Sequence, residues 1–388
     1  MSGGRNIQQV LKITDGEAVV DFYEWLQELV QRGGSDLFLL SGSSPRIRVD
    51  GRVVPLDGPP ITSAVIQQVM NHSGIAGDSG SAMPPPEGCL PDRVLEVPDV
   101  GRFRCHVYRQ SGEWALAFRA IPLKILSLKE LGLPPLLGDL AQKPRGLIVI
   151  TGLSGSGKTT TLAAMLEKIN CERRVHILTL ECPVEFRHSH KKSIISQRSL
   201  GCDVVNLADG LATIRREAPD IVAFGFLDDP DVLETALSLV ESGHLVFGVT
   251  DGASCLQTLQ HLIHLFPPRR DTNVRLRLAA ALEGMVSQAL VPRAHGSGRV
   301  LAAEVVAPTS TVRHLLREDK VQQIYSIMQT GQAKHGMQTL NQALIDLYRR
   351  RMITAPGALA HAYAVEELQH LLQRMDVRMR SHAARPAG

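Results

Sequence analysis

The chain has 388 residues, of which 44% are hydrophobic and 21% are charged, an ordinary globular composition with enough length for two or three domains. Its 42 basic and 39 acidic residues leave a net charge of +3, which gives no reason to expect a nucleic-acid groove and disfavours a translocase acting on DNA or RNA. No apolar stretch approaches the ~18 residues of a membrane-spanning helix and no secretory signal is recognisable, so we expect any membrane role to come through a partner.

The first part of the chain is predicted to form a small α+β domain. Apolar residues from Phe22 to Leu29 have helical spacing, and the strand-like residues 36–40 follow them. Alternating residues at 44–54, around Asp50-Gly51, predict a β-hairpin. The other expected elements are a helix at 64–70, a mobile Gly-, Ser- and Pro-rich loop at 74–92, strands at 102–108 and 114–121, and a proline-containing linker at 122–137.

The run from Gly146 to Thr161 predicts a nucleotide site. Its first half is apolar and rich in β-branched residues, typical of a strand buried in a parallel sheet. Its second half matches G-x-x-x-x-G-K-[ST], in which glycines turn backbone N–H groups toward a phosphate, Lys158 reaches the outer phosphates and the Thr159 hydroxyl holds Mg²⁺. We therefore expect the chain to bind ATP with Mg²⁺. The expected contacts from the loop are Gly152, Ser154, Gly155, Ser156, Gly157, Lys158, Thr159 and Thr160.

The residues after this loop alternate between strand and helix patterns. Apolar residues at helical spacing from Leu162 to Ile169 predict a helix directly after the loop, with its positive dipole end toward the phosphate. The other expected elements are strands at 175–180, 220–225 and 245–250 and a helix at 232–240. This alternation predicts a parallel sheet covered by helices on both faces. From about Ser310 onward the pattern is helical, with a frayed tail at 381–388.

The six cysteines contain no C-x-x-C pair, so they predict neither a zinc element nor a disulfide framework. Reduced thiols in a cytoplasmic protein are the simplest expectation.

Short motifs follow one another along nearly the whole chain. They are Gly-Ser-Asp-Leu at 34–37, Ile-Arg-Val-Asp-Gly at 47–51, Gly-Arg-Phe-Arg at 101–104, Phe-Arg-Ala-Ile-Pro at 118–122, the phosphate loop, His-Ile-Leu-Thr-Leu-Glu at 176–181, Glu-Ser-Gly-His-Leu-Val-Phe-Gly at 241–248 and Gly-Met-Gln-Thr-Leu at 336–340. Together they resemble the secretion ATPase superfamily, specifically the PilT/PilU retraction motors of bacterial type IV pili. Residues 311–318 look like the A-I-R-N-L-I-R-E box of retraction motors, and the ending at 340–348 looks more like PilU than PilT.

This resemblance implies an α/β fold with four parts. They are a PAS-like α+β domain at 1–121, the linker at 122–137, a RecA-like P-loop ATPase domain at 138–310 and a helical C-terminal region at 311–388. It also implies a cytoplasmic hexameric ring, of one chain or mixed with a PilT-like paralogue, held at the inner membrane by the platform protein of the pilus machine. In the family, arginines of the small domain approach the phosphates, and Arg104, Arg109 and Arg119 are the candidates. Solvated strand residues or ion pairs at a subunit interface are the alternative for all three.

Three polar positions of the family's catalytic pocket differ in this chain. The family's G-E-M-R-D corresponds to residues 225–229, so its water-orienting glutamate becomes Phe226. The family's T-I-E-D-P-I-E box corresponds to residues 179–185, where Glu181 and Glu185 are kept and Cys182 replaces the aspartate. Its T-L-H-T motif corresponds to residues 249–252, where Asp251 replaces the histidine. Cys182 is either a reactive thiol or a structural residue.

The resemblance assigns the remaining catalytic roles to Glu181, Glu185 and His244. His244 would sense the γ-phosphate, and a hydrogen bond within the core is the alternative.

Three hypotheses about function follow. The first is a nucleotide-binding retraction subunit with impaired hydrolysis, which assists an active paralogue. The second is a self-sufficient retraction ATPase in which Glu181, Asp228, Asp229 or Asp251 has taken over the missing role. The third is an interaction module in which ATP only stabilises the fold.

Overall fold

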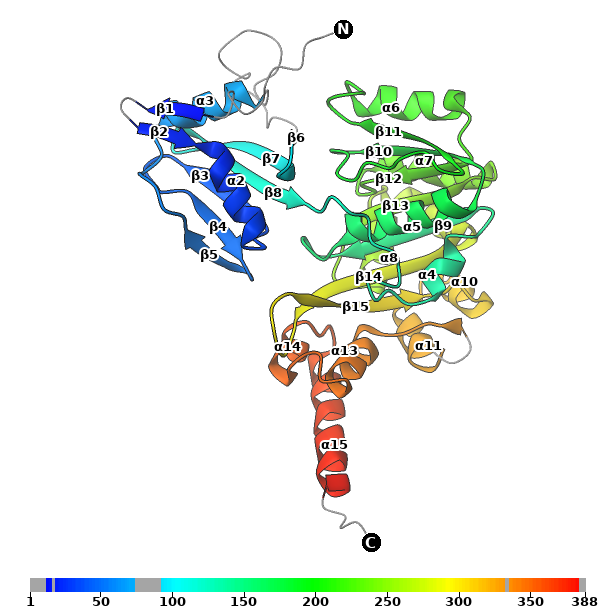
Figure 1. Cartoon of the computed structure of the whole chain (residues 1–388). Helices are drawn as coiled ribbons and strands as arrows, with labels where there is room; N and C mark the ends of the chain where they lie inside the picture. The colour runs from blue at the N-terminus through cyan, green and yellow to red at the C-terminus, as the bar shows by residue number, and fades with distance from the viewer. Residues whose placement is uncertain (1–11, 16–17, 74–91, 332–334, 384–388) are drawn as a thin grey trace. The chain divides into compact units, whose positions relative to one another are not determined.

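The computed structural model describes residues 12–15, 18–73, 92–331 and 335–383, and these residues form two compact units, drawn in Figure 1. The N-terminal unit comprises Met1–Lys124 and Cys182–Arg187, and the second unit comprises Ile125–Glu181 and His188–Gly388. The loop expected at 74–92 lies outside the described residues except for Asp92. The division into four parts expected from the sequence stays a prediction.

An antiparallel sheet forms the core of the N-terminal unit. In its described part the strand order is β5-β4-β3-β8-β7-β6, and β1 pairs with β2 separately. The elements are β1 (Lys12–Asp15), β2 (Ala18–Asp21), α2 (Phe22–Gln31), β3 (Asp36–Leu40), β4 (Arg46–Val49), β5 (Arg52–Pro55), α3 (Ser63–His72), β6 (Arg93–Val97), β7 (Gly101–Gln110) and β8 (Glu113–Ile121). Apolar side chains of α2 and α3, among them Leu26 and Ile66, are buried with those of the sheet in one cluster. The predicted hairpin is confirmed: Asp50 and Gly51 have φ of 47° and 81°, the positive pair that a two-residue turn between twisted strands requires.

A mostly parallel sheet forms the core of the second unit. Its described strands run in the order β11-β10-β12-β13-β9-β14-β15. They are β9 (Gly146–Gly152), β10 (His176–Glu181), β11 (Ile194–Ser199), β12 (Ile221–Phe224), β13 (Leu245–Asp251), β14 (Leu282–Pro292) and β15 (Arg299–Val306). The predicted parallel sheet is confirmed for the neighbours from β11 to β14, whereas β15 is antiparallel to β14. The reason is the short connection at 293–298, which can only return the chain antiparallel.

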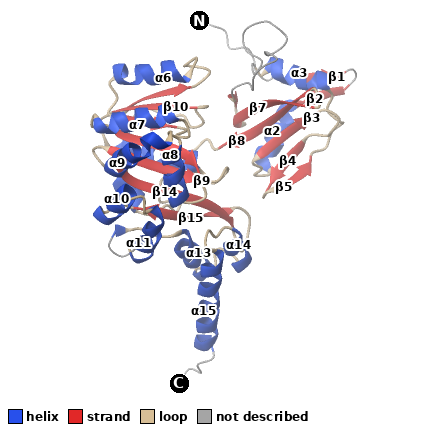
Figure 2. Ribbon diagram, turned by 180° about the vertical axis from the view of Figure 1, so that it is seen from behind, coloured by secondary structure: helices blue, strands red, loops and turns tan. Residues whose placement is uncertain are grey.

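Helices cover both faces of this sheet, as the alternating pattern predicted. Side chains of α4 (Leu136–Leu140) and α5 (Lys158–Glu172) join one buried cluster, and those of α7 (Pro230–Glu241), α8 (Cys255–His264) and α9 (Asp271–Ala281) join another. Figure 2 shows the face that carries α7, α8 and α9. The helix α6 (Leu207–Thr213) and the short η1 (Ile214–Glu217) precede β12, and η2 (Pro268–Arg270) precedes α9.

The chain beyond Ser310 is helical, as expected. Its elements are α10 (Ser310–Arg317), η3 (Val321–Gln323), α11 (Ile324–Thr330), α13 (Leu340–Arg349), α14 (Ala355–Ala360) and α15 (Val365–Ala383). Leu344 and Leu368 are buried with Val291 of β14 and Ala302 of the edge strand β15 in a further cluster. The tail expected to fray from 381 is helical to Ala383, and 384–388 lie outside the described residues. Within the part that the structure describes, no helix combines the length and apolarity that crossing a membrane requires.

Candidate nucleotide site

The phosphate loop connects the end of β9 to the start of α5. Gly152, Gly155 and Gly157 have φ of 153°, 76° and 90°, values that residues with a Cβ rarely adopt, so the loop's path depends on these glycines. Helix α5 begins after Gly157 without a side-chain cap and with no acidic residue in its first turn. The first N–H groups of a helix have no intrahelical partner, and the helix dipole adds positive potential there. The start of α5 is therefore available to an anion.

The residues around the loop fit a phosphate cradle. A Cβ added at Gly152 would lie 2.4 Å from the Ser156 hydroxyl and 2.6 Å from the Gln288 carbonyl oxygen, so only glycine is accommodated there. The Ser156 hydroxyl is buried without a hydrogen-bond partner among the described residues. Gln288 of β14 accepts a hydrogen bond from the Thr161 hydroxyl at 2.8 Å and donates one to the Ser156 carbonyl at 2.7 Å, which ties the loop to the sheet.

Lys158 lies at the start of α5 and turns back over the loop. Its ammonium donates hydrogen bonds to the carbonyl oxygens of Gly152 and Leu153 at 2.9 and 3.2 Å, and to the Asp251 carboxylate at 2.7 Å. Asp251 is the last residue of β13 and pairs with Gly152 of β9, which explains the contact. The Lys158 side chain is 13% exposed and that of Asp251 is 74% exposed.

Several of the residues singled out from the sequence lie together at the carboxyl-terminal ends of the parallel strands. The parallel strands β10, β12 and β13 end at Glu181, Phe224 and Asp251, beside the end of β9. Glu181 is buried and accepts a hydrogen bond from the Thr179 hydroxyl at 2.7 Å. The backbone of Gly225 lies against Glu181, because a Cβ there would be 3.1 Å from the Glu181 Cα. The sheet thus brings Glu181 and the segment beginning at Gly225 to the same end of the strands as the phosphate loop.

Phe226, Asp228 and Asp229, which follow Gly225, have different surroundings. Phe226 is partly buried and packs against the apolar cluster of α7 and α8. Asp229 caps α7, because its carboxylate accepts hydrogen bonds from the backbone N–H groups of Asp231 and Val232 at 2.8 and 3.2 Å. Asp228 is exposed, and its carboxylate contacts the side chains of Thr250 and His261.

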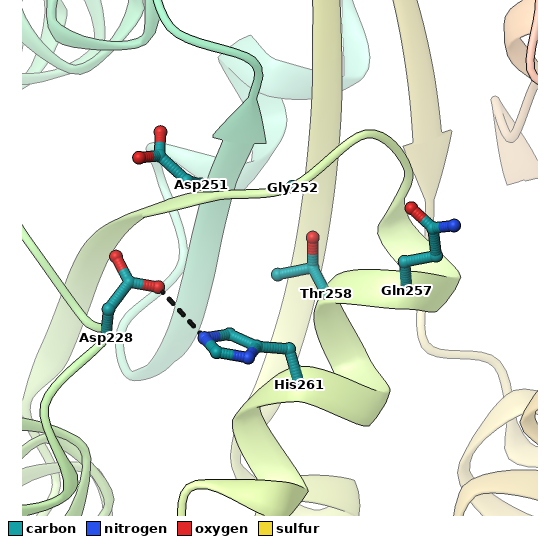
Figure 3. Close-up of a pocket in the computed structure, with 6 residues that line it drawn as sticks. All are labelled: Asp228, Asp251, Gly252, Gln257, Thr258 and His261. Carbon is teal, nitrogen blue, oxygen red and sulfur yellow. Dashed lines mark ion pairs between the residues drawn. The ribbon is translucent and has the colours of Figure 1, made fainter.

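A pocket of about 480 Å³ opens beside Asp228 (Figure 3). Asp228 accepts a hydrogen bond from the Thr250 hydroxyl and lies 3.3 Å from Nε2 of His261 on α8. The lining residues are Asp228, Asp251, Gly252, Gln257, Thr258 and His261. The Thr258 hydroxyl is 2.9 Å from that of Thr151, so α8 is fixed directly to β9. His261, Thr258 and Gln288 could not be singled out from the sequence, since no local motif marks them.

His244 lies at the opposite end of the parallel strands, just before the first residue of the central strand β13. It precedes Leu245, which pairs with Gly146 at the start of β9, whereas the phosphate loop follows the end of β9, about 20 Å along the strand. Its Nδ1 is 2.9 Å from the Leu239 carbonyl oxygen. Within this chain His244 therefore lies far from the loop and has a hydrogen-bond partner in the fold, and its γ-phosphate role stays a prediction.

The three candidate arginines and Glu185 belong to the N-terminal unit. Arg104 of β7 and Arg119 of β8 are cross-strand neighbours. Arg119 donates to Asp36 at 2.9 Å, and the Arg109 guanidinium lies 4.5 Å from the centre of the Trp114 ring. Each of these side chains thus has a partner in its own unit, which tests neither a subunit-interface ion pair nor a phosphate contact, so the roles of all three stay predictions.

Arg104 is held by two carboxylates, Asp92 and Glu185, at 2.6 and 3.0 Å. Burial opposes its charge, but the two carboxylates outweigh burial and raise the pKa of the guanidinium. Cys182, three residues before Glu185, is exposed. Exposure is compatible with a reactive thiol and with a structural residue, so both alternatives stay open.

Comparisons with known proteins agree on one family. Residues 115–355 match the family described as Type II/IV secretion system protein. In Pseudomonas aeruginosa, the type IV pilus retraction ATPase PilT is 38% identical over 87% of this chain and 97% of its own, and the type IV pilus ATPase PilU is 32% identical over 91% and 92%. The crystal structure of the pilus retraction motor PilT with bound ADP has a TM-score of 0.76 at 37% identity, covering 90% of this chain and 99% of that chain. The chain therefore belongs to the type II/IV secretion system protein family, together with the pilus ATPases PilT and PilU.

Proposed function

We propose that this chain is an ATP-binding subunit of a type IV pilus retraction motor, impaired in hydrolysis and assisting an active PilT-like paralogue. The observation that supports the proposal is an uncapped, glycine-dependent phosphate loop, in a chain whose resemblance to the family puts Phe226 at the position of the water-orienting glutamate. Binding and hydrolysis use different atoms, so one can persist while the other is lost.

The loop residues would hold the nucleotide. Backbone N–H groups from Gly155 to Thr160 face the phosphates, Lys158 supplies the cation, and the Thr159 hydroxyl is the ligand available to Mg²⁺. The bound nucleotide supplies the phosphoanhydride bond that a retraction motor consumes. The known binding of ADP by the PilT relative supports this assignment.

We expect weak hydrolysis because the resemblance to the family puts Phe226, and no carboxylate, at the place of the glutamate. Phe226 cannot accept a proton or orient a water molecule, and such help is typically worth ~10² to 10⁴-fold in rate. Glu181 and Glu185 remain as carboxylates of the family's catalytic box. Glu181 is buried at the carboxyl-terminal end of β10, on the side of the sheet where the phosphate loop lies. We infer that the subunit responds to nucleotide but contributes little turnover by itself.

The test is phosphate release by the purified chain, alone and with a full-length PilT-like paralogue from the same cell. Weak release alone, with altered release or force in the mixture, supports an assisting subunit. Robust release alone contradicts impaired hydrolysis.

Asp228 favours a second candidate, a self-sufficient motor. Its carboxylate is exposed in the pocket beside the loop and lies 3.3 Å from His261, a group able to accept a proton. Asp229 and Asp251 are less suited to the role, because Asp229 caps a helix and Asp251 pairs with Lys158. If Asp228 has taken over, Asp228→Asn will abolish a substantial rate of phosphate release; if release is already near background, this candidate fails.

We expect the working form to be a hexameric ring, of this chain or mixed with the paralogue, that docks on the cytoplasmic side of the inner membrane through the pilus platform protein. The likeness to PilT over 90% of the chain supports this expectation. Light scattering of micromolar protein with Mg²⁺ and ATP is expected to give the mass of six subunits, alone or after addition of the paralogue. Monomers under all these conditions would contradict the ring.

Two arginines of the box at 311–318, Arg313 and Arg317, are four residues apart on α10 and are expected to act differently. Arg313 donates to the carbonyl oxygens of Ala279 and Ala280 at the end of α9 and to Glu283 at 2.7 Å, whereas Arg317 is exposed. Arg313→Ala should therefore lower the free energy of unfolding by about 1–3 kcal/mol, and Arg317→Ala by less than about 0.5 kcal/mol.

Denaturant unfolding and twitching measured on the same two variants distinguish stability from docking. Twitching lost in Arg317→Ala, with normal stability and ATP binding, indicates a partner contact on the motor surface. Normal twitching in Arg317→Ala shows that its charge does not serve retraction, and equal stability of both variants would contradict the structural role of Arg313.

A further inference from the structure

The ammonium group of Lys158 has no free donor. A lysine carries three N–H donors, and this one directs them to the carbonyl oxygens of Gly152 and Leu153 and to the carboxylate of Asp251. A phosphate oxygen can therefore contact the lysine only by displacing one of these three partners. Asp251 is the one that carries a charge, so it is the strongest competitor for the position of an anionic ligand.

The fold fixes Asp251 at this place. Its backbone is paired with Gly152, the first glycine of the loop, across neighbouring strands about 4.8 Å apart. Gly252 follows directly, and a Cβ there would lie 2.1 Å from the Thr258 hydroxyl, so the chain after Asp251 is closely packed. Figure 3 shows the Asp251 side chain directed away from the Asp228–His261 pair. Asp251 is therefore held beside the loop and is not part of that second pair.

The two partners differ in exposure, and this makes the contact reversible. The Lys158 side chain is 13% exposed, so the cation stays in the loop, whereas the Asp251 side chain is 74% exposed and can rotate into solvent. An ion pair with one partner in solvent is weak and is screened by salt. A polyphosphate with several charges can replace it, at a cost that includes the repulsion between the displaced carboxylate and the phosphates.

We propose that Asp251 is a built-in competitor of the nucleotide phosphates at Lys158, which lowers the affinity of the loop for polyphosphate and speeds the release of bound nucleotide. The inference rests on the proposed nucleotide-binding function and assigns Asp251 a role different from catalysis. As a consequence, the loop binds nucleotide less tightly than it would without Asp251. The site therefore fills only at a higher nucleotide concentration.

Asp251→Asn removes the charge and keeps the size of the side chain. It is expected to raise the affinity for Mg²⁺-ADP and for inorganic tripolyphosphate about 5- to 20-fold, because the competing charge and its repulsion of the phosphates are both lost. The gain for AMP should be smaller, since the lysine of this motif reaches the outer phosphates. Calorimetry with these three probes, at low and high salt, measures the effect, and the gain should shrink at high salt.

Two control variants separate the pairing from general charge loss. Asp251→Glu keeps the charge and should stay within about 2-fold of the unaltered protein. Asp231→Asn removes an exposed carboxylate from the first turn of α7 and should leave the affinities unchanged. An equal gain in Asp231→Asn, or an equal gain for AMP and ADP, would show that Lys158 is not the reason for the effect.

The remaining outcomes separate this inference from the proposed function. If the unaltered protein binds ADP and Asp251→Asn binds it no more tightly, the inference is wrong and the nucleotide-binding function stands. If the unaltered protein does not bind and Asp251→Asn does, the competitor role is supported in its strongest form and ATP binding by the unaltered chain is contradicted. If neither binds, both are wrong.

Discussion

Phe226→Glu is expected to release phosphate from ATP about 10- to 100-fold faster than the unaltered protein, whose own rate should be barely above background. General-base help is worth ~10² to 10⁴-fold, and the recovery should be partial because Cys182 and Asp251 also differ from the family. Phe226 lies two residues beyond Phe224, at the end of β12 and on the edge that carries the phosphate loop. By the resemblance to the family, a carboxylate there would stand at the position of the water-orienting glutamate.

The matched control is Phe226→Gln. Glutamine has the size of glutamate and also puts a polar side chain in this partly buried position, but it cannot act as a base. Its rate should stay at the level of the unaltered protein. Thermal unfolding of both variants shows whether the loss of the phenyl ring from the apolar cluster destabilises them equally. If the unaltered protein is already a robust ATPase, or if glutamate lowers the rate, another carboxylate performs the task and impaired hydrolysis is wrong.

Lys158→Ala is expected to weaken binding of Mg²⁺-ATP by about 10- to 100-fold or more. A hydrogen bond to a charged group contributes about 1.5–3 kcal/mol, and Lys158 is the cation that the loop itself provides. The fold should persist, because the Asp251 carboxylate left without its partner is largely exposed and remains hydrated. Calorimetry with a non-hydrolysable triphosphate measures the change.

Lys168→Ala provides the control on the same helix. Lys168 pairs with Glu172 on α5, four residues on, and lies ten residues beyond the loop's lysine. Its loss should leave the affinity for nucleotide unchanged. Equal affinity in Lys158→Ala and the unaltered protein would mean that this loop is not the nucleotide site, and the proposals about Phe226 and Asp251 would fail with it.

The sequence alone determined the elements whose signals are local. The turn at Asp50-Gly51, the helix after the phosphate loop and the buried strand before it each follow from a few neighbouring residues, because backbone preference and apolar period act over that range. The loop's role as a phosphate cradle was predictable for the same reason. Its glycines, lysine and threonine are consecutive, so the motif itself sets their geometry.

The tertiary structure decided which distant residues surround that loop. Lys158 and Asp251 are 93 positions apart, and they meet only because β13 lies beside β9 in the sheet. The same order brings Gln288 of β14 to the loop, and the parallel direction of β13 and β9 leaves His244 at the end of the strands away from the loop, although the resemblance suggested a phosphate contact. Strand order depends on how helices and strands pack over the whole unit, and no short stretch of sequence encodes it.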